Sequence, residues 1–458
     1  MKIDIPACVE FSIKKLIGDG YDAYAVGGCV RDALLGVAPK DWDIATTAAP
    51  SEISAVFEAY KCLTHGADYG TITVLFDGKT VEITTFRIDG KYTDNRRPDS
   101  VRFTRSLLDD IRRRDFTINA LAYRHDCGLV DYFGGREDLD NGIVRCVGDA
   151  RERFKEDALR ILRALRFASR LSFTIEEHTA AAIHEMKDSL RNIARERICA
   201  ELSGILSASG DGAAVVLREF SDVIHAIFPG LDHCANAWDC IIRSIANTPP
   251  ELALRLALLL APPPTPAQLQ QSPPAPALLP PLPQQGLRPK PPSTEARRML
   301  HELRFGNEVI DEVTVLIDTV CADAISCDSS ADQMQRISGD VQIKRLLNAL
   351  GERRLRLLLH AKRALVLAGC HAEDAKIRQL REIGAAESRI SEIINNGECY
   401  SLMTLNINGK DLLSIGYKPG KPLGMALREL LERVVAGNCP NERRALLDQA
   451  KDIMQIFY

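Results

Sequence analysis

The sequence predicts an α+β head followed by a long all-α remainder, and two observations lead to this fold class. Short runs typical of β-strands alternate with turns over roughly the first 140 residues. Beyond that point, apolar residues recur at helical spacing instead. The length of 458 residues suits about two to four domains and is ample for well-packed cores.

Composition limits the classes of protein to which the chain can belong. Hydrophobic residues make up 46% of the sequence and charged residues 26%, which excludes wholesale disorder. No apolar run reaches the roughly 18 residues that a bilayer span needs, and the N-terminal residues lack a signal-peptide pattern. We therefore expect a cytoplasmic protein, with no membrane association, whose 13 Cys are reduced and mostly buried. The formal net charge of -4 does not favour nucleic-acid binding, but it is compatible with a local basic face.

The strands of the head are predicted from β-branched and aromatic runs between turns. They cover residues 24–28, 42–46, 71–76 and 80–86. The dipeptide Asp77-Gly78 separates the last two, and this pair is a strong signal for a hairpin.

Helices follow from apolar stripes in the second part of the chain. We expect one helix around Leu159, Leu162 and Leu165, and another around Ile198, Leu202 and Ile205. Leucine-rich helices are predicted at 254–260, 343–359 and 425–435. More than half of the 23 Pro lie between 262 and 292, which predicts a solvated linker or loop that interrupts the helical region.

The strongest chemical signal lies between residues 27 and 46. Gly27 and Gly28 form a turn after a strand, where backbone amides can approach phosphate oxygens closely. Asp41 and Asp43 are two residues apart on the next predicted strand, so both carboxylates are expected on one face. Paired carboxylates are what two Mg²⁺ ions need to bridge a triphosphate and an attacking hydroxyl.

This segment resembles the first motif of the class II tRNA nucleotidyltransferases, the CCA-adding enzymes, and of their relatives the bacterial poly(A) polymerases. Further segments resemble the remaining motifs in the order of the family, at 112–123, 134–145, 156–173 and 195–202. The resemblance implies a polymerase-β-type nucleotidyltransferase head with a mixed sheet, followed by an all-α neck, body and tail. It also implies template-independent addition of the 3′-terminal CCA to tRNA, with CTP and ATP as substrates and Mg²⁺ as cofactor.

The resemblance assigns the roles of individual residues. Asp41 and Asp43 would be catalytic and hold the metal ions, and Glu82 on the neighbouring strand is a candidate third metal ligand. The residues implied in nucleotide binding are Gly27, Gly28, Arg31, Arg114, Asp115, Asn119, Asp157, Arg160, Arg163 and Arg166.

Helical spacing connects some of these residues. Asp157 and Arg160 are expected on one face of a helix, where a carboxylate and a guanidinium can imitate a Watson–Crick edge. Asp115 and Asn119 are likewise expected to share a helical face. For Arg195 and Arg197, organisation of the neck helices and direct ligand contact are both open.

Enzymes of the family with different activities differ in particular segments of their sequences. Residues 64–76 lack the basic stretch typical of poly(A) polymerases, and residues 89–103 look like the complete loop that CC-adding enzymes shorten. Ala261-Pro262 stands where relatives with a phosphohydrolase-type domain carry His-Asp. The alternatives left open are an enzyme that adds only A, a poly(A) polymerase and a catalytically inactive tRNA-binding protein.

The expected partner is tRNA, bound at its 3′ end and acceptor/TΨC region, with no obligate protein partner. Lys410, Lys418, Lys421 and Arg428 are candidate phosphate contacts. The expected domains are a catalytic head at 1–145, a nucleotide-selecting neck at 146–215, a degenerate HD-like body at 216–260 and 293–385, a proline-rich linker or loop at 261–292, and a tRNA-binding tail at 386–458.

Overall fold

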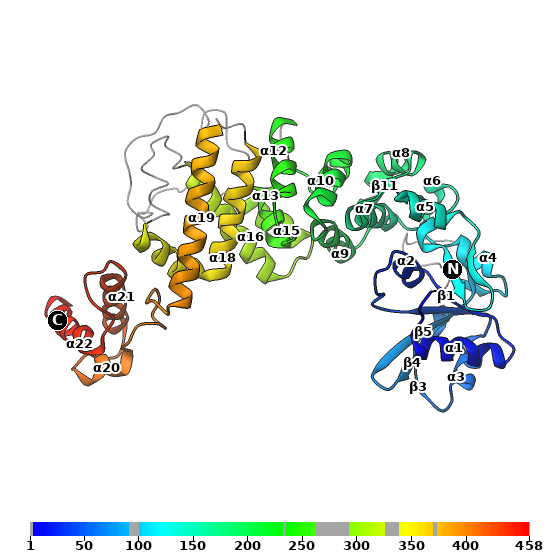
Figure 1. The fold of residues 1–458 in the computed structure, drawn as a ribbon, viewed down its shortest axis with the longest axis horizontal. Helices are drawn as coiled ribbons and strands as arrows, with labels where there is room; N and C mark the ends of the chain where they lie inside the picture. The colour runs from blue at the N-terminus through cyan, green and yellow to red at the C-terminus, as the bar shows by residue number, and fades with distance from the viewer. Residues whose placement is uncertain are drawn as a thin grey trace. The chain divides into compact units, whose positions relative to one another are not determined.

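The computed structural model describes residues 3–90, 100–231, 235–261, 293–325, 339–369 and 373–457 (Figure 1). The chain divides into two compact units, Met1–Leu231 and Asp232–Tyr458. The first unit contains a mixed sheet followed by helices, and the described part of the second is helical. The predicted α+β fold class is therefore confirmed.

A seven-stranded sheet forms the centre of the first unit, in the order β3-β4-β5-β2-β1-β8-β9. β2 and β5 are parallel, and all other neighbours in this sheet are antiparallel. Its strands are β1 (Ala23–Val26), β2 (Asp43–Thr46), β3 (Lys61–Gly66), β4 (Thr71–Phe76), β5 (Lys79–Thr85), β8 (Leu121–Arg124) and β9 (Gly128–Asp131).

All four predicted strands are present, with small shifts at their ends. β4 and β5 form the predicted hairpin, in which Phe76 pairs with Lys79 and Gly78 adopts φ +76°. β1 ends at Val26 rather than at residue 28, because Gly27 turns the chain with φ +80°. β2 begins at Asp43, so the expectation that Asp41 lies on the strand is wrong. Asp41 occupies a bend just before it.

Both faces of the central strands are buried, because neighbouring residues point to opposite sides. Ala25 and Ile44 belong to one core with apolar residues of α1 (Ala7–Gly18) and α3 (Pro50–Val56). The next residue along each strand belongs to a second core, which includes Leu107 and Ile111 of α4 (Leu107–Arg112). The sheet therefore lies between helices.

The rest of the first unit consists of short elements around the sheet and of a run of helices. α7 packs against α9 and α10, and the apolar stripes predicted for α7 and α9 are buried. The elements are α2 (Gly28–Leu34), β6 (Arg87–Asp89), β7 (Val101–Phe103), η1 (Ala67–Tyr69), η2 (Thr117–Asn119), α5 (Gly135–Asn141), β10 (Ile143–Val144), α6 (Ala150–Glu156), α7 (Leu159–Leu171), β11 (Thr174–Ile175), α8 (Glu177–Met186), η3 (Lys187–Asn192), α9 (Arg195–Leu206), α10 (Gly210–Glu219) and α11 (Ser221–Ile227).

The described part of the second unit is a set of helices with a separate apolar core near its C-terminal end. α18 packs against α12, α16 and α19, and it is longer than predicted and kinked at Gly351, where φ is 75° and ψ is 165°. Its helices are α12 (Ala235–Ala246), α13 (Leu252–Leu260), α15 (Ser293–Glu302), α16 (Asn307–Ile325), α18 (Asp340–Ala368), α19 (Glu373–Asn395), α20 (Gly409–Ser414), α21 (Lys421–Val435) and α22 (Arg443–Phe457).

Two sequence expectations fall outside the described residues. The proline-rich segment at 262–292 is one, and the central part of the loop at 89–103 is the other. Among the described helices, none combines the length and the apolar character that a membrane crossing requires. The described cysteines carry free thiols, and all except Cys127 are at least half-buried.

Candidate active site

Three acidic residues are found where the pairing of the parallel strands β2 and β5 begins. Asp43 opens β2 and stands directly opposite Glu82 of β5 in the parallel register. Asp41 lies two residues upstream, and the intervening Trp42 is buried whereas both aspartates are exposed. This alternation agrees with the expectation that both carboxylates lie on one face, although only Asp43 is in the strand. Glu82 is the third acidic residue here, because it pairs with Asp43 in the parallel register.

The pKa of Asp43 is changed by burial and by neighbouring charges. The protein desolvates its carboxylate, although the residue as a whole is exposed, and this raises the pKa of Asp43. Glu82 and Asp41 raise the pKa further by repulsion, while Arg114 acts in the opposite direction. A divalent cation would relieve this repulsion, and carboxylate oxygens are the ligands that Mg²⁺ prefers. Within the described residues, no three acidic, His or Cys side chains are already gathered closely enough to enclose a metal.

Gly27 allows Arg114 to lie against the turn between β1 and α2. A Cβ added at Gly27 would be 2.7 Å from Nη1 of Arg114, so the Arg114 side chain would have to shift, and the φ of +80° itself favours glycine. The Gly27 amide donates to the carbonyl of Leu121 across the sheet, over 3.0 Å. The neighbouring Gly28 is the first residue of α2. The glycine turn and Arg114 are thus parts of the same site as Asp43.

A chain of buried and half-buried polar side chains joins α2 to α7. Arg31 donates through Nη1 to the side-chain oxygen of Asn119, and its Nε and Nη2 pair with Asp32. Asn119 donates from Nδ2 to Oδ1 of Asp115, over 3.0 Å. Arg163 donates from Nε to the other oxygen of Asp115, over 2.8 Å. Four residues predicted to bind nucleotide therefore form one network.

Asp115 is the acidic centre of that network. Burial alone would raise its pKa, but the charge of Arg163 and the hydrogen bond from Asn119 outweigh burial and lower the pKa to about 2. Its contact with Asn119 does not come from a shared helical face, so that expectation is wrong. Asp115 lies between α4 and η2, and the chain returns to it through a 3-10 turn.

Asp157 occupies a junction between α6 and α7 rather than a helix, which corrects the predicted placement with Arg160. Its φ of -145° and ψ of 103° are extended, and the backbone of Leu159 donates to Oδ1 over 3.0 Å. Arg197 of α9 donates to both carboxylate oxygens, at 3.3 and 2.7 Å. Asp157 acts as a cap at the start of α7, and such capping favours a break between helices.

Arg160 connects the neck helices to the segment that follows α4. It donates from Nη1 to Glu156 over 2.6 Å and from Nη2 to the backbone carbonyl of Arg113 over 3.1 Å. Both Asp157 and Arg160 are buried and engaged with protein partners. A nucleotide read by this pair must share or replace some of these bonds.

The last two predicted arginines surround an aromatic ring. The guanidinium carbons of Arg163 and Arg166 lie 5.5 and 5.1 Å from the centre of the Phe167 ring, and that of Arg31 lies 4.9 Å from it. Arg166 also pairs with Glu201 of α9, at 2.7 Å. The structure therefore brings α2, α7 and α9 together around a strongly basic cluster.

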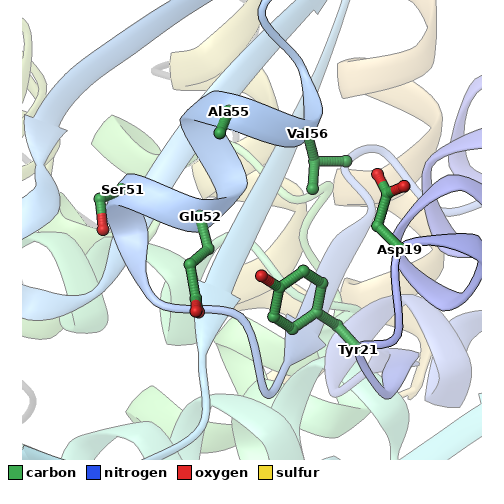
Figure 2. A pocket seen from close by; sticks show the side chains of 6 residues that line it. All are labelled: Asp19, Tyr21, Ser51, Glu52, Ala55 and Val56. Carbon is green, nitrogen blue, oxygen red and sulfur yellow. The ribbon is translucent and has the colours of Figure 1, made fainter.

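A pocket elsewhere in the first unit contains none of these residues. It is lined by Asp19, Tyr21, Ser51, Glu52, Ala55 and Val56 (Figure 2). Figure 2 shows the side chains of Tyr21 and Glu52 directed toward each other. Its charged lining is acidic, without a Lys or Arg, so it is unsuited to the phosphates of a nucleotide.

Comparisons with known proteins bear on the same segments. The family model described as the Poly A polymerase head domain matches residues 23–145. A model described as the probable RNA and SrmB-binding site of polymerase A matches residues 172–234, and one described as tRNA nucleotidyltransferase domain 2 matches residues 360–450.

A curated CCA-adding enzyme of Lacticaseibacillus paracasei is 35% identical to the chain over 444 residues, covering 97% of this chain and 95% of that protein. The chain belongs to the CCA-adding enzymes. A relative of the same name from Enterococcus faecalis is also 35% identical and covers 96% of this chain and 94% of its own length. The family identifies the chain as a nucleotidyltransferase of tRNA processing, and it supports addition of CCA over the alternatives left open above.

Solved structures agree with this membership. The CCA-adding enzyme of Bacillus stearothermophilus in complex with CTP has a TM-score of 0.68 and 28% identity, and the match covers 98% of this chain and 97% of that one. The Thermotoga maritima CCA-adding enzyme complexed with tRNA has a TM-score of 0.63, covers 99% of this chain and, at 20% identity, supports the fold alone.

Several residues of the site escaped sequence reasoning. Asp110, Glu156 and Glu201 each hold an arginine of the site. Asp110 lies three residues before Arg113 and four before Arg114, and Glu156 lies four residues before Arg160. This spacing of opposite charges is a signal that could have identified both. Glu201 lies 35 residues or more from its partners, so no local pattern points to it.

Proposed function

We propose that this chain rebuilds the 3′-terminal CCA of tRNA without a nucleic-acid template, using CTP and then ATP. The observation that carries the proposal is the register of Asp43 with Glu82 beside Asp41, which puts three carboxylates at one strand edge in a member of the CCA-adding family. Arg114 and the glycine turn adjoin this edge. Acidic residues that can hold a metal, next to groups that can bind phosphates, suit the transfer of a nucleotide from a triphosphate to the 3′ end of tRNA.

Asp41 and Asp43 are proposed to hold Mg²⁺, with Glu82 as a third ligand. When bound, Mg²⁺ supplies activation of the primer 3′-hydroxyl and stabilisation of the departing pyrophosphate. No side-chain nucleophile is required for this chemistry. The chain contributes by holding the carboxylates in fixed positions near the start of β2. Positioning and charge neutralisation account for most of the rate enhancement of such transfers.

Arg114 is proposed to bind the triphosphate beside the glycine turn. Its Nε is buried and has no hydrogen-bond partner in the described residues, although Nη2 pairs with Asp110. An N–H group left in this state fits an incoming phosphate oxygen. Gly27 and Gly28 provide close backbone approach at the same place. Arg31 is already engaged with Asp32 and Asn119, so we assign it to support of the nucleotide site.

The remaining polar residues are proposed to select and hold the nucleoside. Asp157 can accept a hydrogen bond from the amino group of C or A, and Arg160 can donate to a ring nitrogen or carbonyl. Asp115 and Asn119 are proposed to contact the ribose. Arg163 and Arg166 belong to the basic cluster at Phe167 and are proposed to stabilise the bound nucleotide.

The division of labour along the chain follows the predicted domains. The head at 1–145 would carry the chemistry and the neck at 146–215 would select the nucleotide. The body would act as a scaffold, and the tail at 386–458 would hold tRNA through groups such as Lys410, Lys418, Lys421 and Arg428. Cytoplasmic location, action without a protein partner and binding of the acceptor/TΨC region belong to the same proposal.

The proposal is tested with purified protein, Mg²⁺ and three tRNA transcripts that end at the discriminator base, at C and at CC. Each transcript receives labelled CTP, labelled ATP or both, and the products are sized to one nucleotide. We expect all three to reach CCA and then to stop. Extension of the CC-ended transcript alone would replace the proposal by addition of A only, and long A tails on unstructured RNA would replace it by poly(A) synthesis.

A further inference from the structure

A fully buried carboxylate lies directly behind the two arginines that follow α4. Asp110 has an exposed fraction of 0%, although Asp and Glu are almost never fully buried unless they are paired. Its Oδ1 accepts hydrogen bonds from Nε and Nη2 of Arg113, at 3.1 and 2.7 Å. Its Oδ2 accepts from Nη2 of Arg114, at 3.4 Å. One carboxylate therefore anchors two consecutive arginines.

Arg114 connects Asp110 to the proposed site for metal and triphosphate. Arg114 lies against Gly27, and its charge acts on Asp43. Asp110 forms an ion pair with this guanidinium, whereas Arg114 lowers the pKa of Asp43 through its charge. While Asp110 keeps its charge, Arg114 is paired through Nη2, and its buried Nε has no hydrogen-bond partner among the described residues.

Arg113 connects Asp110 to Arg160, one of the residues proposed to select the nucleotide. The backbone carbonyl of Arg113 accepts a hydrogen bond from Nη2 of Arg160, at 3.1 Å. The Arg113 side chain is fixed from behind by Asp110 and also pairs with Asp89, at 3.6 Å. A shift of Arg113 would therefore displace an acceptor of Arg160.

A third contact joins Asp110 to β6, which pairs with β7 in a separate two-stranded sheet. The backbone amide of Arg87 at the start of β6 donates to Oδ1 of Asp110, over 3.3 Å. Burial alone would raise the pKa of Asp110, but Arg113 and Arg114 outweigh it and the pKa is lowered. The carboxylate is thus charged at neutral pH and holds the β6 backbone and both arginines at one point.

We infer that Asp110 is a positioning residue of the nucleotide site, which holds Arg114 for the triphosphate and Arg113 beneath Arg160. This inference rests on the proposed function, because Arg114 and Arg160 gain their roles from it. Asp110 touches no substrate in this account. Its effect is transmitted through the two arginines, so its loss should act on nucleotide affinity more than on the fold.

The test is a double-mutant cycle between Asp110→Asn and Arg114→Ala in the full chain. The dissociation constant for CTP is measured by equilibrium titration in Mg²⁺ without tRNA, so that variants without turnover still give a value. Asp109→Asn is the matched control, because Asp109 precedes Asp110 in α4 and, among the described residues, its carboxylate accepts a hydrogen bond from Thr104 while its backbone amide donates to Ser106. Thermal unfolding of each variant reports the fold.

We expect Asp110→Asn to weaken CTP binding by about 10- to 100-fold, the range typical of residues that orient a binding group. In the Arg114→Ala background the same substitution should have at most a few-fold effect, and Asp109→Asn should bind CTP as the wild type does. Unchanged affinity of a folded Asp110→Asn protein, or an equal loss in both backgrounds, would overturn the inference. If Asp110→Asn does not fold, Asp110→Glu is judged by the same two outcomes.

Failure of this inference differs from failure of the proposed function. A wild-type protein that extends tRNA while Asp110→Asn binds CTP normally contradicts only the role of Asp110. A wild-type protein that extends none of the three transcripts contradicts the proposed function, whatever the variants do.

Discussion

Asp43 of β2 and Glu82 of β5 stand opposite each other in a parallel strand pair, each with its side chain exposed. Like charges directly opposite each other destabilise a sheet, and here they contribute to the raised pKa of Asp43. A cation bound between the two carboxylates would relieve their repulsion. This relationship gives the strongest geometric support for a metal site, because it joins segments 39 residues apart in the sequence.

Replacement of Glu82 tests whether the third carboxylate binds metal. In Glu82→Gln the repulsion on Asp43 falls but an oxygen ligand of full charge is lost, so we predict a higher Mg²⁺ concentration for half-maximal incorporation. The expected shift is about 10-fold or more. The measurement is a Mg²⁺ titration of CTP incorporation, with the exposed Glu58→Gln as control. An unchanged Mg²⁺ requirement would remove Glu82 from the metal site.

The glycine turn gives a second prediction. In Gly27→Ala the new Cβ would meet Arg114, and the backbone at φ 80°, ψ -133° lies in a region nearly restricted to glycine. We expect a loss of about 1–3 kcal/mol in the free energy of unfolding, together with weaker CTP binding. Gly18→Ala is the control, since a Cβ there meets nothing within 4 Å. Wild-type CTP affinity in Gly27→Ala would contradict the proposed place of Arg114.

The pair of Asp157 and Arg197 predicts an effect on nucleotide choice. In Asp157→Asn the side chain gains donors and loses charge, so it can no longer present the same acceptors to C and A. We expect the preference for CTP and ATP over UTP to fall by about 1–3 kcal/mol, the value typical of one good base contact. Incorporation ratios with the three nucleotides measure it.

Arg195 provides the control for that experiment. It is exposed at the start of the same helix as Arg197, and its side chain forms no hydrogen bond or ion pair with the residues that the structure describes. Arg197→Lys should blur nucleotide choice in the same direction as Asp157→Asn, whereas Arg195→Lys should leave it unchanged. Equal effects of the two arginine variants would indicate a general contribution of charge to RNA binding.

Asp115 predicts a dependence of stability on pH. Its pKa of about 2 in the folded state lies below its ordinary value of 3.8, so the unfolded chain binds more protons between these values. The stabilisation by Asp115 is therefore fully present above about pH 4 and is lost as the pH falls toward 2. Urea unfolding of the wild type and of Asp115→Asn measures this: the difference between them should shrink as the medium becomes more acidic. A difference that is constant with pH would contradict the ion pair with Arg163.

The sequence predicted those parts of the molecule that depend on neighbouring residues. Asp77-Gly78 specifies its hairpin because a two-residue turn fixes the pairing of the strands beside it. The apolar stripes of α7 and α9 follow from helical periodicity, and both are buried. The exposure of Asp41 and Asp43 around the buried Trp42 follows from alternation along the chain.

Parts that depend on distant residues were not predictable in this way. The strand order that puts β5 beside β2 depends on packing of the whole sheet, and Glu82 gains its significance only from it. The expected continuous helix through Asp157 fails because the carboxylate caps α7 and is held by Arg197, 40 residues away. Asp115 and Asn119 do meet, but through a turn and a 3-10 segment rather than a helical face.

The most direct test of the account compares the wild type with Asp43→Asn on one substrate. Both proteins receive a tRNA transcript that ends at the discriminator base, with CTP, ATP and Mg²⁺, and product masses are determined. The account predicts that the wild type adds C, C and A and stops. It predicts that Asp43→Asn adds nothing, while its unfolding temperature without metal is equal to or above that of the wild type, because the desolvated charge that raises the pKa of Asp43 is gone. Extension by a folded Asp43→Asn protein would contradict the placement of the active site at this strand edge.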